Sequence, residues 1–119
     1  MSTKQERMMR LCAVAALKRN MDLAELGRLG DARAETRARL EALRDSVARL
    51  VTSDPVLMGV QQRHRLWADA QRAELNMTLA RQQAEWLDAR ARTRRSFGRA
   101  TVLARLEKAW KATRTPGET

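Results

Sequence analysis

The feature that most constrains this chain is a single strong helix-breaking sequence near its middle, residues 52–55, Thr-Ser-Asp-Pro. Asp54 is a good N-cap, because its carboxylate can accept hydrogen bonds from the free backbone N–H groups of a first helical turn. Pro55 suits the first helical position, and it forces the preceding residue out of the helical conformation. One helix should therefore end before this sequence, and another should begin at Pro55.

Residues that interrupt helices are rare in the rest of the chain. It has 5 Gly and 2 Pro in 119 residues, and 44% of its residues are hydrophobic. An all-β fold needs more turns, and a disordered chain is usually less apolar. The composition instead favours an all-α chain of two long helices that form an antiparallel coiled coil. The predicted organisation is one helical hairpin over residues 1–119, with a helix over about 3–51, a turn at 52–55, a helix over about 55–113 and a disordered tail at 114–119.

The first predicted helix repeats its apolar residues at heptad spacing, which packs two helices along one seam. Arg33 and Thr36 occupy two positions within this repeat. The apolar positions are Leu26, Leu29, Leu40, Leu43, Val47 and Leu50. From Leu26 onward the pattern therefore predicts a coiled-coil seam.

Before Leu26 the repeat continues only after a phase shift, at Val14, Leu17 and Met21. Two glycines, Gly27 and Gly30, lie near that shift, and each weakens a helix by roughly 1 kcal/mol relative to alanine. The sequence therefore predicts either a bend in a continuous helix or a break that ends one helix at Gly30.

In the second predicted helix, the residues at strict heptad spacing are mostly alanines. They are Leu66, Ala70, Ala73, Met77, Ala80, Ala84, Leu87 and Ala91. This register places several large apolar side chains on the water-facing side, and tryptophan is the residue most enriched at binding hot spots. The candidate partner-binding residues there are Trp67, Leu75, Leu79 and Trp86. A shifted register, or a first helix folded back at Gly30, would instead cover them.

The stretch from Ala89 to Leu106 contains six arginines and no acidic residue. At 100° per residue, Arg92, Arg95 and Arg99 form one stripe, and we expect this stripe to bind a partner. Such a helix attracts an acidic protein surface or nucleic-acid phosphates. Nucleic acid is less favoured because aromatic residues that stack on bases are sparse. Because the chain has 20 Arg against 4 Lys, a solvated helix in an arginine-rich protein is the alternative.

Groups able to carry catalysis are few. The single histidine, His64, should lie opposite Leu43 in the hairpin seam and far from the single cysteine, Cys12. The chain also lacks the lysine of a phosphate-binding glycine-rich loop. We therefore expect no enzymatic activity, no cofactor and no metal site, and the lone Cys12 fits a reducing cytoplasm.

The end of the second helix, Phe97-Gly98-Arg99-Ala100 followed by Leu103-Ala104-Arg105-Leu106-Glu107-Lys108-Ala109-Trp110, carries a family resemblance. On a short basic chain with two long helices, it resembles the FliJ-type proteins of flagellar export and their YscO-type relatives in injectisomes. The resemblance implies a cytoplasmic coiled-coil stalk that binds and stimulates a hexameric export ATPase. It also implies links to the membrane export gate and to export chaperones, with a peripheral place at the inner membrane through the export apparatus and no membrane insertion of its own.

Two other functions are consistent with the same residues. In the first, the chain is a basic helical hairpin that binds nucleic acid or ribosomes. In the second, it is a self-assembling coiled-coil scaffold. In the scaffold, Trp67, Leu75, Leu79 and Trp86 would pack between copies as in a four-helix bundle.

Overall fold

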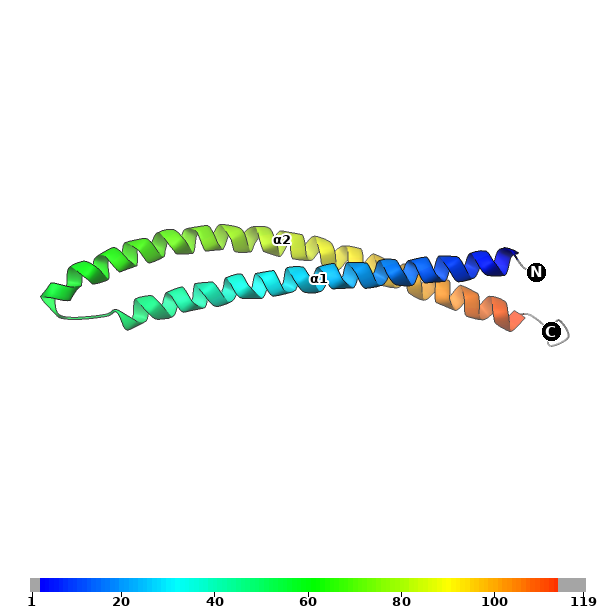
Figure 1. Cartoon of the computed structure of the whole chain (residues 1–119), viewed down its shortest axis with the longest axis horizontal. Coiled ribbons are helices and arrows are strands. Elements are labelled where there is room, and N and C mark those ends of the chain that lie inside the picture. Colours follow the sequence, from blue (N-terminus) through cyan, green and yellow to red (C-terminus); the bar gives the residue numbers. More distant parts are fainter. Residues whose placement is uncertain (1–2, 114–119) are drawn as a thin grey trace. The chain divides into compact units, whose positions relative to one another are not determined.

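The computed structural model describes residues 3–113, which form two helices. Helix α1 spans Thr3–Arg49 and helix α2 spans Pro55–Thr113, with a short loop between them (Figure 1). The chain is an antiparallel helical hairpin, which confirms the predicted all-α fold. Helix α1 ends two residues before the expected position, and the predicted tail at 114–119 lies outside the described residues.

The loop is held by hydrogen bonds that end one helix and start the next. A carboxylate oxygen of Asp54 accepts from the backbone N–H of Val56 at 3.0 Å, so Asp54 caps α2 as its sequence position predicts. The hydroxyl of Thr52 accepts from the N–H of Asp54 at 3.1 Å. The N–H of Thr52 in turn donates to the side-chain oxygen of Gln61 at 3.1 Å, which ties the loop to the second turn of α2.

The chain packs as two units, each built from a part of α1 and a part of α2. The described residues of unit 1 are 3–27 and 87–113, and unit 2 is Arg28–Trp86. In unit 1 the Cys12 thiol lies 3.4 Å from the carbonyl oxygen of Leu103, and residues later in α1 contact residues earlier in α2. The two segments of unit 1 are therefore antiparallel.

Along α1, the side chains shielded from water recur at unbroken heptad spacing. These seam positions are Gln5, Met8, Cys12, Ala15, Arg19, Asp22, Leu26, Leu29, Arg33, Thr36, Leu40, Leu43, Val47 and Leu50. Leu29 and Thr36 are the most deeply buried. The heptad predicted from Leu26 onward is correct, and it also runs back to the start of the helix.

The predicted phase shift in α1 is wrong. Val14, Leu17 and Met21 are 63%, 61% and 61% exposed, so they lie outside the seam. Polar residues, among them Arg19 and Asp22, occupy heptad positions in this part of α1. The spacing of apolar residues therefore could not predict these seam positions.

Helix α1 continues through Gly27 and Gly30 without a break, so of the two predicted alternatives the continuous helix is correct and the break at Gly30 is excluded. No glycine in the described part of the chain has a positive φ. Apart from the backbone of its own helix and its two chain neighbours, a Cβ atom added at Gly27 would have no atom within 4 Å. Both glycines are therefore ordinary helical residues, and Gly27 has open space beside it.

Replacing Gly27 with alanine should stabilise the chain by about 0.5–1 kcal/mol, because alanine fits the helical backbone and loses less entropy on folding. Thermal unfolding followed by circular dichroism at 222 nm measures the change. The reverse substitution at a nearby exposed position, Ala24→Gly, should lower stability by a similar amount. An unchanged or lower stability of Gly27→Ala would show that α1 is not helical at this point.

Helix α2 has a different register from the predicted one. Its shielded positions are Gln61, His64, Ala68, Gln71, Leu75, Leu79, Gln82, Trp86, Ala89, Thr93, Ser96, Ala100, Leu103, Glu107 and Trp110. Steps of three and four alternate along this seam, except that two steps of four follow each other from Gln71 through Leu75 to Leu79. This is a stutter, an insertion that locally unwinds a coiled coil.

The alanine-rich stripe predicted as the seam of α2 is instead exposed. Met77 on that stripe is 73% exposed and Leu87 is 47% exposed. Leu75, Leu79 and Trp86, predicted to face water, are half-buried. The register was wrong because polar side chains occupy many true seam positions, while small apolar residues line the outside.

The two registers predict opposite mutational effects at two neighbouring positions. Leu79→Ala should cost about 1–2 kcal/mol, the part of a full core truncation expected for a half-buried leucine. Met77→Ala should change stability by less than about 0.5 kcal/mol, because its side chain is mostly in water. Urea denaturation of both variants measures the difference. A larger loss of stability in Met77→Ala than in Leu79→Ala would show that the alanine-rich stripe is the seam of α2.

Candidate protein-docking surface

The positive charge of the chain is concentrated in unit 1. Its described residues include 13 Lys and Arg against 5 Asp and Glu, a net charge of +8. Unit 2 has 10 Lys and Arg against 8 Asp and Glu, a net charge of +2. Unit 1 therefore has the surface potential that attracts an anionic partner.

One of the acidic residues of unit 1, Asp22, forms hydrogen bonds inside the seam. Its carboxylate accepts hydrogen bonds from the Ser96 hydroxyl and, at 3.0 Å, from the Lys18 ammonium group. The backbone carbonyl of Asp22 accepts from the Thr93 hydroxyl at 3.2 Å. The bond from Ser96, followed by the bond from Lys18, lowers the pKa of Asp22 below its ordinary value of 3.8.

A second acidic residue, Glu107, is paired in the same unit with a cation and with the cysteine. It lies 2.9 Å from the ammonium nitrogen of Lys111. Hydrogen bonding with Cys12, and then with Lys111, lowers the pKa of Glu107, while the same bond to Glu107 raises the pKa of Cys12. A thiol held in its protonated form is a poor nucleophile.

The predicted arginine stripe lies on the surface of unit 1. Arg92, Arg95 and Arg99 are all exposed. At the same three-and-four spacing the stripe continues into two apolar residues, Val102 and Leu106, which are 53% and 51% exposed. One flank of α2 therefore changes from cationic to apolar along its length.

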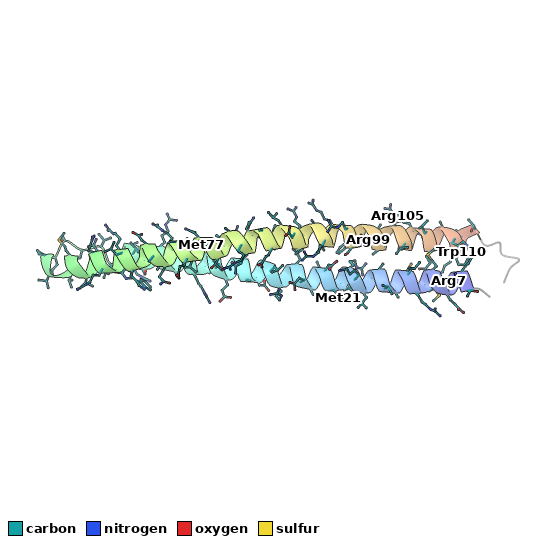
Figure 2. The ribbon with its side chains drawn as sticks, turned by 90° about the horizontal axis from the view of Figure 1, so that it is seen from above. Arg7, Met21, Met77, Arg99, Arg105 and Trp110 are labelled. Atoms are coloured by element: carbon teal, nitrogen blue, oxygen red, sulfur yellow. The ribbon has the colours of Figure 1, made fainter. Side chains whose placement is uncertain are left out.

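Beside this flank, α1 and α2 form an open cavity of about 400 Å³ near the first turns of α1. Its apolar lining consists of Met8, Leu11, Leu106 and Trp110, and its cationic lining consists of Lys4 and Arg7. Figure 2 shows Arg7 and Trp110 at the same end of the hairpin. The cavity is thus an apolar depression with positive charge beside it.

A second cavity, of about 380 Å³, also includes Leu11 in its lining. Val14 and Leu103 add apolar surface there, and Lys18 and Arg99 add positive charge. Leu11 lines both cavities, and we call the two cavities together the unit 1 groove. The apolar groove residues were not predicted from the sequence, although Leu106, at heptad spacing behind Arg99, was a usable signal.

In unit 2, His64 is part of the helix seam. Its Nε2 atom lies 3.1 Å from the hydroxyl oxygen of Ser46, and that hydroxyl donates a hydrogen bond to the carbonyl oxygen of Leu43 at 2.8 Å. The centroid of the His64 ring is 5.5 Å from that of Trp67, whose side chain is 53% exposed. His64 therefore packs beside Ser46, one helical turn from the predicted Leu43.

Trp86 lies inside unit 2, where α1 covers it. The guanidinium carbon of Arg33 is 3.9 Å from the centroid of the Trp86 ring, a cation–π contact. Arg33 also donates to the side-chain oxygen of Gln83 at 2.9 Å. Of the residues predicted to bind a partner, Leu75, Leu79 and Trp86 thus lie in the seam, whereas Trp67 and the arginine stripe lie at the surface.

Together these features define a basic antiparallel helical hairpin with an apolar groove on one flank. Among residues 3–113, no three His, Cys, Asp or Glu side chains gather in the way a metal ion would require. Neither helix, over that same range, has a stretch long and apolar enough to cross a membrane. Comparisons of the chain with protein-family models, curated proteins and solved structures find no match.

The lowered pKa of Asp22 predicts a pH dependence of stability. Because the folded-state pKa lies below the unfolded one, the contribution of Asp22 is present above the unfolded pKa and is lost as the pH falls through the folded pKa. Between about pH 5 and pH 2, the wild-type chain should lose more stability than Asp22→Asn. Chemical denaturation across this range measures the two slopes, with Asp31→Asn as an exposed control. Equal slopes for wild type and Asp22→Asn would contradict the prediction.

Proposed function

We propose that this chain is a non-enzymatic coiled-coil stalk or adaptor that docks a partner protein through unit 1. The observation that carries the proposal is the charge of +8 on the paired helices of that unit. Asp22 and Glu107 pair with Lys18 and Lys111, and the net charge of +8 already includes these pairs. A paired-helix surface of this kind suits a partner with an acidic face.

The specific form of the proposal is a FliJ-type stalk of a flagellar or type III export apparatus. The antiparallel hairpin is the architecture that the resemblance implies, and the residues of the resemblance, 97–110, all belong to the cationic unit. In this role the chain binds and stimulates a hexameric export ATPase. It also links that ATPase to the export gate and to export chaperones, next to the inner membrane.

The same arginines support nucleic acid as a second candidate partner. Arg92, Arg95 and Arg99 are exposed on a stretch without acidic residues, as phosphate contacts require. Self-assembly through the second helix has less support. Leu75 and Leu79 are half-buried in the seam of the hairpin itself, so they offer little surface to another copy.

The proposal predicts that the full chain binds the export ATPase from its own source and raises its turnover. Replacing Arg92, Arg95 and Arg99 together with glutamate should weaken this binding at least about tenfold, because the replacements turn attraction into repulsion. Co-elution and phosphate release measure binding and turnover.

The matched control replaces three exposed arginines of unit 2 with glutamate. They are Arg63, Arg65 and Arg81, and this variant should change binding of the ATPase no more than about twofold. A chain that neither binds the ATPase nor changes its turnover would overturn the export proposal. Affinity for RNA that falls about 10³-fold between low and moderate salt would favour nucleic acid instead.

A further inference from the structure

We infer that the unit 1 groove binds an acidic amphipathic helix of a partner protein, which packs against α1 and α2 as a third helix. The inference rests on the proposed function in taking the occupant to be a protein. It adds the place of docking and the chemistry of the partner segment.

The spacing of the groove residues favours a helical occupant. On α1 the groove residues outside the helix seam lie at positions 4, 7, 11, 14 and 18, in alternating steps of three and four, and seam residues Met8 and Ala15 complete the lining. On α2 the residues that line the two cavities lie at 96, 99, 103, 106 and 110, with the same alternation. Coiled coils pack along such spacing, so a third helix can contact both rows turn by turn. From Lys4 to Lys18, α1 rises roughly 21 Å, enough to pair with about two heptads.

The floor of the groove is apolar surface that remains in water. Leu11 is 53% exposed, Val14 is 63% exposed and Leu106 is 51% exposed. Three large aliphatic side chains from two helices, gathered in one depression, mark a surface that gains free energy when a partner covers it. The matching face of the partner helix is therefore apolar.

The charge around the groove determines the flanks of the partner helix. Lys4, Arg7, Lys18 and Arg99 line the two cavities, and no acidic residue lines either of them. A helix with Asp and Glu beside its apolar stripe complements these cations, whereas a basic helix is repelled.

The shape and lining of the groove favour a helix over nucleic acid or a lipid surface. Trp110 is the one aromatic residue that lines it, at one end, so a row of bases would find little to stack on. The apolar floor also lies between two helices, and a flat membrane surface does not fill a concave site.

The test uses the full chain and a synthetic, fluorescein-labelled helix of three heptads. The acidic probe has leucine at its core positions and glutamate on both flanks, and a matched basic probe has lysine in place of glutamate. Fluorescence anisotropy should show saturable binding of the acidic probe and at least about tenfold weaker binding of the basic probe.

Variants of exposed residues then place the probe on the groove without unfolding the chain. Leu11→Gln and Leu106→Gln should each weaken binding of the acidic probe about tenfold, the effect of removing one buried leucine. The control Leu17→Gln changes another exposed leucine of α1, which does not line the groove, and it should change binding less than about twofold.

Several outcomes would overturn the inference. They are no binding of the acidic probe, equal effects of Leu11→Gln and Leu17→Gln, or equal affinity for the basic probe. Binding of RNA or of vesicles with anionic lipid that depends on Leu11, without binding of the acidic probe, would also overturn it. The probe assay contains no export ATPase, so the two proposals can fail separately. A chain that binds the probe and not the ATPase would contradict only the export proposal. A chain that binds the ATPase and not the probe would contradict only the groove inference.

Discussion

The pairing of α1 with α2 along a single heptad stripe is the constraint on which the other features of this chain depend. A hairpin of two helices shields one stripe of each, so few side chains are fully removed from water. Among the described residues, the buried hydrophobic side chains are Leu29, Ala68, Ala89 and Ala100. The remaining stabilisation must come from many half-buried contacts, and most other surface of each helix stays open to a partner.

Because the apolar core is thin, polar contacts inside the seam have an unusual share in fixing the register. Arg33 stacks on Trp86 and binds Gln83, and Asp22 accepts hydrogen bonds from Lys18 and Ser96. A polar group at a core position of a coiled coil typically costs stability and specifies one alignment of the helices. In this hairpin such groups recur in both units, so a slip by one turn would leave several polar groups without their partners.

These polar contacts also explain which features the sequence could predict. The Asp54 cap, the helical content and the heptad after Leu26 follow from local chemistry and apolar spacing, and the structure has them. The register of α2 does not follow from local chemistry and apolar spacing. Seam positions such as Gln82 and Thr93 hold polar residues typical of a surface, whereas Met77, outside the seam, is a residue typical of a core. The arginine stripe could be predicted because it lies on one helix. The unit 1 groove could not be predicted, because its residues come together only when both helices pair in the correct register.

The uneven placement of tryptophan makes the chain its own optical reporter. The sequence has no tyrosine, and all three tryptophans are on α2, so intrinsic emission comes almost entirely from that helix. Each indole has a different environment. Trp67 is about half exposed beside His64, Trp86 lies under a guanidinium group, and Trp110 lines the groove. Emission from single-tryptophan versions would therefore separate events at the groove from opening of the seam near Trp86, without an attached dye.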